Sequence, residues 1–174
     1  ESYTLADDQV TYTFKLRDDI KWSNGEPVTA YDFEFAWKRA LDPALAADYA
    51  YQLYYIKGAE SYNNGQGTAD DVAVKALDDR TLEVVLESPT AYFLELTSFY
   101  TYYPVCKEVV ESNPDWAKDP STYVSNGPFK LTEWIHNAKI MILKNENYYD
   151  ADKVKLDGIE FAILEDENTA WQKY

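Results

Sequence analysis

The stretch from residue 21 to residue 43 constrains the folding of this chain most, because turn and helix signals follow one another there without a gap. Asn24 and Gly25 tolerate positive φ angles, so the backbone is predicted to reverse at this dipeptide. Pro27 fixes its own φ and stiffens the exit from the turn. A tight turn that leads directly into a helix is therefore expected here.

The helix that follows is predicted by its cap, its apolar spacing and its stop signal. Thr29 is a favourable N-cap residue, and Asp32 three positions later is close to the capping-box pattern. Asp42 precedes a proline and is therefore pushed out of the helical region, which ends the helix. One buried stripe is expected from the apolar residues of this helix, which are Phe33, Ala36, Trp37, Ala40 and Leu41.

Strands are predicted where apolar and polar residues alternate at period two. They lie at residues 10–17, in two hairpins at 72–76 with 82–86 and at 129–131 with 140–143, and at 159–163. Further helices are predicted at 44–58, at 88–99, at 108–112 and from residue 168 or 169 onward. The aromatic run at 99–103 is expected to be an extended connector. Strands and helices in this order indicate a mixed α/β fold.

The composition is that of a folded protein, and the charge excludes several partners. Of the 174 residues, 46% are hydrophobic and 16% are aromatic, which is enough to build a core. The net charge of −15 argues against nucleic acid, whose phosphates need a basic surface, and against direct binding to an anionic membrane. No apolar run approaches the ~20 residues of a membrane-spanning helix.

The residues offer little for catalysis or metal binding. His136 and Cys106 are each the single residue of their type, and no Gly-x-Ser-x-Gly motif surrounds a serine. Neither a nucleophilic triad nor a thiolate metal site is expected, and we interpret His136 as a solvated surface residue. The 31 acidic residues leave a pair of catalytic carboxylates open, because sequence does not set their separation. The 16 tyrosines are more informative, since tyrosine suits binding surfaces.

Four runs of residues show an order and spacing that a good turn and a good helix cap do not explain. The first is Lys-Trp-Ser-Asn-Gly-Glu-Pro-Val-Thr-Ala at 21–30, preceded by Leu16-Arg17 and followed by Asp32-Phe33. The others lie at 77–83, at 125–131 with Trp134, and at 145–149. Together they resemble the large extracellular solute-binding proteins of family 5, the oligopeptide-binding proteins that serve ABC transporters. The one departure in the first run is Asn24, where Asp is commoner, and a turn tolerates this change.

The resemblance implies a fold of the type II periplasmic-binding-protein kind, in a parent several hundred residues long with three domains. Residues 1–107 would form the additional mixed α/β domain of these large proteins. Residues 108–174 would form part of one ligand-binding lobe, truncated at its C-terminus. Both ends of the chain are accordingly expected to be cut from a longer protein.

The same resemblance implies a transport protein and not an enzyme. The intact protein would close two lobes over an extracellular oligopeptide and deliver it to a membrane permease. It would work as a monomer without a cofactor or nucleic acid. It would lie on the extracellular side of the cell membrane as a lipid-anchored protein, or in the periplasm.

Three aromatic residues are candidates for ligand contact by the same resemblance: Tyr49, which follows the helix stop, and Phe99 and Tyr100 in the connector. No catalytic or metal-binding residue is assigned. The acidic group that grips the amino terminus of the peptide would belong to the missing lobe. We therefore predict that this chain alone folds but binds peptide weakly or not at all.

Three alternatives stay open from the sequence. The nearest keeps the scaffold and changes the solute to a dipeptide, an oligosaccharide, a nickel complex or heme. A carboxylate-based hydrolase is more distant, because it needs two acids in one cleft with opposed pKa shifts. A purely structural or adhesion module is the third.

Overall fold

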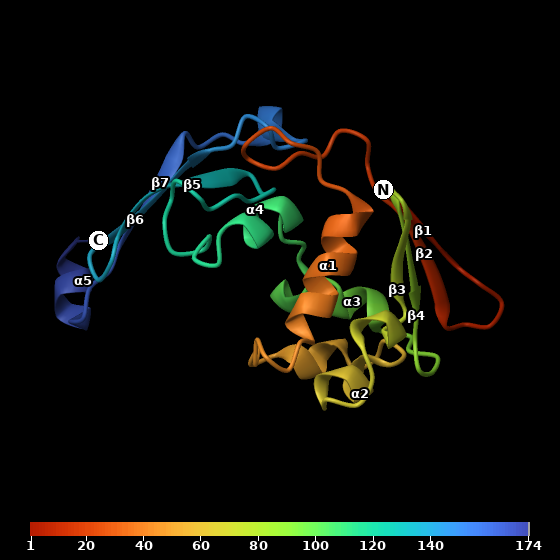
Figure 1. The fold of residues 1–174 in the computed structure, drawn as a ribbon. Coiled ribbons are helices and arrows are strands. Elements are labelled where there is room, and N and C mark those ends of the chain that lie inside the picture. Colours follow the sequence, from red (N-terminus) through yellow and green to blue (C-terminus); the bar gives the residue numbers. More distant parts are fainter. Residues whose placement is uncertain (174) are drawn as a thin grey trace. The chain divides into compact units, whose positions relative to one another are not determined.

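The computed structural model describes residues 1–173, and contacts along the chain divide it into two compact units (Figure 1). The first unit consists of Glu1–Asp18 and Thr29–Lys107. The second consists of Asp19–Val28 and the chain from Glu108 onward. The predicted mixed α/β fold is confirmed, whereas the identity of these units as domains of a longer protein stays a prediction.

The first unit contains a four-stranded antiparallel sheet in the order β1-β2-β4-β3. Its strands are β1 Ser2–Leu5, β2 Thr11–Lys15, β3 Val74–Asp78 and β4 Thr81–Val85. Tyr12 pairs with Val84, which in turn pairs with Val74, and all three are buried on one face of the sheet. The alternation in the sequence therefore predicted the buried face, while the short exposed edge strand β1 was not predicted.

Helix α1, Ala30–Ala40, packs against β3 and β4 (Figure 1). The predicted capping box is confirmed, because Asp32 Oδ2 accepts hydrogen bonds from the Thr29 N–H at 2.9 Å and the Thr29 hydroxyl at 3.1 Å. Trp37 is buried, and its Nε1–H donates to the Tyr102 carbonyl at 2.8 Å. The apolar stripe of α1 thus joins the core of the first unit.

The helix predicted at 44–58 is wrong. This region contains only the 3₁₀ turn η1, Ala50–Leu53, and then the short helix α2, Ala59–Asn63. Asp42 Oδ1 accepts the Ala44 N–H at 2.8 Å, and Ala46 has a φ of 51°, so the backbone leaves the helical region immediately after α1.

The helix predicted at 88–99 is also largely wrong, because only one turn forms, α3 Phe93–Leu96. The hydroxyls of Thr97 and Ser98 donate to the carbonyls of Leu94 and Glu95, both at 2.7 Å, and so compete with helix continuation. The connector at 99–103 is not extended throughout, since it contains the 3₁₀ turn η3, Tyr100–Tyr102. A further 3₁₀ turn, η2, spans Ala69–Asp71.

The second unit contains a three-stranded antiparallel sheet in the order β5-β6-β7. Its strands are β5 Phe129–Ile135, β6 Lys139–Lys144 and β7 Gly158–Ala162, which confirms the predicted hairpin and final strand. The remaining elements of this part of the chain are α4 Lys107–Ser112, η4 Ala151–Lys153 and α5 Glu167–Lys173. The helices predicted at 108–112 and near the C-terminus are therefore confirmed.

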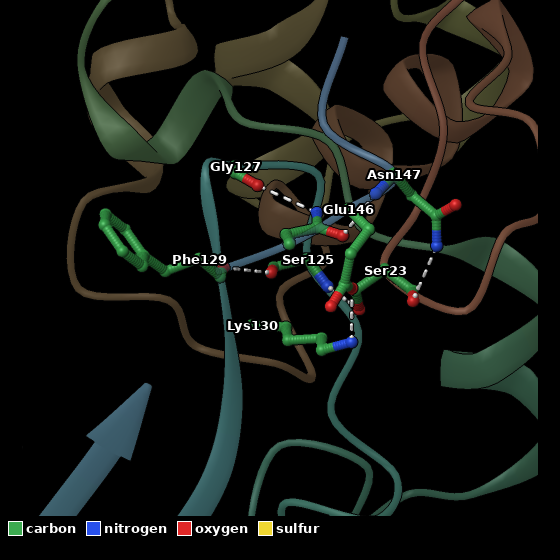
Figure 2. A network of polar contacts seen from close by, with 8 residues as sticks. Ser23, Ser125, Gly127, Phe129, Lys130, Glu146 and Asn147 are labelled. Atoms are coloured by element: carbon green, nitrogen blue, oxygen red, sulfur yellow. Dashed lines mark hydrogen bonds and ion pairs between the residues drawn. The ribbon is translucent and has the colours of Figure 1, made fainter. Parts of the chain in front are cut away.

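A polar network ties the turn of the second unit to two later runs of the sequence (Figure 2). The Ser23 N–H donates to the Ser125 carbonyl at 2.7 Å, and Asn147 Nδ2 donates to the Ser23 carbonyl at 3.2 Å. Asn145 is fully buried, and its Nδ2 donates to the Gly127 carbonyl at 2.8 Å. Three of the runs that carry the family resemblance therefore meet at one place.

Candidate ligand-binding site

The three candidate aromatic residues lie together on the surface of the first unit. Tyr49 immediately precedes η1, whereas Phe99 precedes η3 and Tyr100 begins it. The Tyr49 ring centroid lies 5.5 Å from that of Phe99 and 5.5 Å from that of Tyr100, in both cases edge-on. Phe99 and Tyr100 stack at 4.3 Å. Residues 50 positions apart in the sequence thus form one cluster of rings, which we call the aromatic cluster.

Buried contacts beneath the aromatic cluster hold its two segments together. The Tyr102 hydroxyl donates to the Gln52 carbonyl at 2.5 Å, which links η3 to η1. The Tyr102 ring also lies edge-on to Trp37 at 5.2 Å, so that α1 supports the same point. Burial raises the pKa of Tyr102, which keeps this hydroxyl protonated as a donor. The surface rings are therefore positioned by a packed layer below them.

The rings of the cluster remain accessible. Tyr49 is 42% exposed and Tyr100 is 55% exposed, although both are aromatic. Partial burial of its hydroxyl raises the pKa of Tyr100, and the neighbouring Tyr49 and Asp48 act in the same direction. The hydroxyl is accordingly neutral at physiological pH and can donate or accept a hydrogen bond.

Two further tyrosines belong to this surface, and the sequence analysis did not select them. The Tyr51 ring lies 6.0 Å from that of Tyr49. Tyr103 is 57% exposed, and its hydroxyl donates to the Ser98 carbonyl at 3.0 Å. The signal available in the sequence was the density of tyrosine on either side of the selected positions, but the wrong helix at 44–58 hid the role of Tyr51.

Five of the aspartates act as local caps. In five cases a carboxylate accepts hydrogen bonds from a Thr or Ser two or three residues away, at Asp8, Asp71, Asp78, Asp119 and Asp166. These bonds favour the charged form and lower the pKa of each carboxyl. These five carboxyls are therefore poor candidates for a catalytic acid, which needs a raised pKa.

Three further observations concern His136, metal ligands and membrane-spanning helices in the described part of the chain. His136 is exposed, and its ring lies 4.2 Å from that of Trp134 on the β5–β6 hairpin. Among residues 1–173, no group of three or more His, Cys, Asp or Glu side chains is placed to hold a metal ion. In the same residues, no helix has the length and apolar character needed to cross a bilayer.

Aromatic side chains that gather at a hollow of the surface are typical of ligand-binding sites. The chain belongs to the bacterial extracellular solute-binding proteins of family 5, since residues 1–174 match the middle region of that family. The resemblance inferred from the sequence runs is thereby confirmed.

Two of the similar proteins, both from Bacillus subtilis, are named for peptide binding. The chain is 55% identical over 168 residues to the oligopeptide-binding protein OppA of Bacillus subtilis. The alignment covers 96% of this chain and 31% of that protein. The chain is 50% identical over 174 residues to the dipeptide-binding protein DppE of the same organism, covering all of this chain and 32% of that protein. The chain therefore spans about a third of the length of these relatives.

Two solved structures match the fold closely. The substrate-binding domain of an oligopeptide ABC transporter from Bacillus anthracis superposes with a TM-score of 0.96 at 46% identity, over 100% of this chain and 34% of that one. Listeria monocytogenes OppA bound to peptide superposes with a TM-score of 0.94 at 41% identity, over 100% of this chain and 35% of that one.

Proposed function

We propose that this chain is part of the substrate-binding component of an ABC importer that captures extracellular oligopeptides. The observation that carries the proposal is the aromatic cluster, because three rings selected as ligand contacts from the sequence lie within 5.5 Å of one another. The cluster belongs to a chain whose relatives include an OppA bound to peptide.

The cluster is suited to contact a peptide without reading most of its sequence. Exposed ring faces pack against any apolar or flat group, and the Tyr49 and Tyr100 hydroxyls reach the N–H and C=O groups that every peptide carries. The other contacts to the ligand would come from parts of the intact protein outside this chain. Closure of two lobes would then exclude water from the bound peptide.

The location and partners follow from the family. Members are extracellular solute-binding proteins, and the relatives from Escherichia coli and Salmonella typhimurium are named periplasmic. We infer that the intact protein works outside the cell membrane, either lipid-anchored or in the periplasm, and hands its ligand to a permease as a monomer. Residues 1–107 would supply the additional domain, and residues 108–174 part of a ligand-binding lobe.

A second candidate keeps the scaffold and changes the solute. One relative from Escherichia coli, 37% identical over 177 residues, is named a probable deoxycholate-binding periplasmic protein. An exposed cluster of tyrosines also fits the flat faces of a sterol or a sugar. Peptide is favoured because both relatives at 50% identity or more carry peptide-binding names.

Native mass spectrometry of the intact protein, purified without denaturation, tests the proposal. We expect a ladder of co-purified masses that sequence as mixed short peptides. A single non-peptide mass would keep the scaffold and replace the ligand. A protein that binds no peptide added at millimolar concentration would contradict the proposed function.

A further inference from the structure

A hollow of about 350 Å³ adjoins the aromatic cluster, and all of its lining belongs to the first unit. This volume lies at the lower end of the ~300–1,000 Å³ that ligand pockets enclose, so it suits one side chain better than a whole peptide. The lining consists of small and apolar residues, tyrosines and two charged residues: Ala36, Arg39, Ala40, Leu45, Ala47, Asp48, Tyr49, Tyr100, Thr101, Tyr103 and Val105.

The floor of the hollow exists because α1 carries alanine there. Ala36 and Ala40 lie one helical turn apart and therefore on the same face of α1. Their methyl groups leave space that a larger side chain would fill. Leu45 and Val105 continue the floor with apolar surface.

The walls are tyrosine rings already fixed in place. Tyr49 is held edge-on by two neighbouring rings, and Tyr100 is stacked on Phe99 at 4.3 Å. The Tyr103 hydroxyl is bonded to the Ser98 carbonyl at 3.0 Å, while 57% of the residue stays exposed. Because these rings are ordered in advance, a ligand group that enters the hollow loses little affinity to the ordering of side chains.

The charges of the lining select for a neutral group. Arg39 and Asp48 carry opposite signs, so the lining has no net charge. A charged side chain of either sign would meet one attractive and one repulsive group there, so the pair gives it no net attraction to offset the hydration that it loses at an apolar floor. A neutral aromatic ring does not meet this penalty, and it can stack on or meet edge-on the tyrosines around it.

We propose that this hollow takes one aromatic side chain of the bound peptide. The intact protein then selects, at one position of the peptide, Phe, Tyr or Trp over small and charged residues. This inference rests on the proposed function, because it assumes that the ligand is a peptide.

The test is isothermal titration of the intact protein with an alanine pentapeptide in which Phe, Lys or Glu replaces each alanine in turn. We expect Phe at one position to tighten binding by about tenfold relative to alanine, the effect of burying an aromatic ring. Lys and Glu at that position should give no such gain. The increase in affinity from Phe should be absent in the Ala40→Leu variant, whose larger side chain fills the hollow. It should be reduced in the Tyr103→Ala variant, which lacks one of the lining rings.

The controls separate the possible failures. Tyr92→Ala removes a tyrosine that is 48% exposed and lies outside the hollow, so it should keep the full gain from Phe. Ala40→Leu should bind the all-alanine peptide as the wild type does, which shows that the variant is folded. Equal binding of all peptides, or a gain that survives in Ala40→Leu, would overturn the aromatic selection alone. Binding of no peptide at all would overturn the proposed function together with it.

Discussion

At the scale of single residues, Asp32 does more than cap a helix. Its Oδ2 accepts from Thr29 at the start of α1, and its Oδ1 accepts the Lys107 N–H at 3.0 Å. Asp32 is 7% exposed, and its hydrogen bonds to Thr29 and Lys107 are partly buried. One carboxylate thus joins the first turn of α1 to a residue 75 positions later. The sequence predicted the capping bond but not the long-range one, because no local pattern marks it.

Replacing Asp32 by Ala should lower the free energy of unfolding of the first unit by about 2 kcal/mol, because partly buried donors lose a charged acceptor and α1 loses its capping box. Urea denaturation followed by far-ultraviolet circular dichroism measures this loss. The matched control is Asp70→Ala, at an exposed aspartate whose side chain makes no hydrogen bond within the described residues. This substitution should leave the free energy of unfolding almost unchanged. Equal effects of the two substitutions would contradict the role given to Asp32.

Acid should weaken the β3–β4 hairpin through Asp78. Its carboxylate accepts from the Thr81 hydroxyl at 2.7 Å and from the Arg80 N–H at 2.8 Å, and these bonds lower its pKa below 3.8. The folded form therefore holds its proton less tightly than the unfolded form. The stabilisation is complete above pH 3.8 and is lost as the pH falls through the lower folded value.

The measurement is the melting temperature of wild type and Asp78→Asn between pH 7 and pH 3. We expect the wild type to be the more stable at pH 7 and the difference to shrink on acidification. A difference that does not change with pH would show that the charge of Asp78 is irrelevant to the hairpin.

At the scale of elements, prediction succeeded where several local signals agreed. Helix α1 has a cap, an apolar stripe and a stop, and it forms where predicted. In the hairpin of β5 and β6, apolar and polar residues alternate on both sides of a turn at Asn137, whose φ is 61°. The helices expected at 44–58 and 88–99 also had an apolar face and an end signal, Gly58 in the first and Ser88-Pro89 in the second, yet neither forms as predicted. There, side-chain bonds to the backbone and burial of Phe93 decided the structure instead.

Gly58 is the last residue of the helix expected at 44–58, but in the structure it marks the entry to α2. It has a φ of 79°, and a Cβ placed on it would lie 2.2 Å from the Asp71 carbonyl oxygen. Gly65 has a φ of 74° but no atom within 4 Å of such a Cβ. The two glycines therefore share a backbone conformation and differ in the space around them.

Gly65→Ala should cost about 1 kcal/mol of stability, the strain of a left-handed alanine. Gly58→Ala should cost more by at least about 2 kcal/mol, because the backbone at Asp71 must also move. Urea denaturation of both variants gives the difference directly. Similar costs would mean that the contact at Asp71 is relieved by an easy shift of the loop.

At the scale of the whole molecule, local patterns could not assign the segment Asp19–Val28 to its unit. It is preceded and followed in sequence by parts of the first unit, yet its contacts are with the second, through Ser23, Ser125 and Asn147. Hydrogen bonds between residues more than 100 positions apart leave no periodic signal. These residues lie in the runs that carry the family resemblance. The sequence therefore marked them as important, but it did not show which of them are hydrogen-bonded to one another.

The second unit has few buried side chains of its own. Among residues 108–172, only Asn145 is buried, and the segment Asp19–Val28 adds Trp22 and Val28. The apolar residues of its sheet line an open hollow of about 400 Å³ with Tyr123, from Leu131 and Trp134 on β5 to Ile140 and Ile142 on β6. This face of the sheet is therefore apolar and open within the described residues.

The candidate site was predicted from the resemblance and not from periodicity. Tyr49, Phe99 and Tyr100 were selected by family position, and the structure brings their rings together. Tyr51 and Tyr103 could not be added from the sequence, because their placement depends on the 3₁₀ turns that replaced the expected helix and connector.

The most direct test of the central claim is the affinity of the intact protein for the peptide Ala-Ala-Phe-Ala-Ala, measured by isothermal titration for wild type and Tyr49→Ala. Tyr31→Ala, at a tyrosine that is 46% exposed on α1 and outside the aromatic cluster, is the matched control. We predict that Tyr49→Ala weakens binding by about tenfold, as loss of an aromatic contact does, while Tyr31→Ala has no effect. Unchanged affinity in a folded Tyr49→Ala protein would contradict the assignment of the aromatic cluster as the peptide-binding surface of this chain.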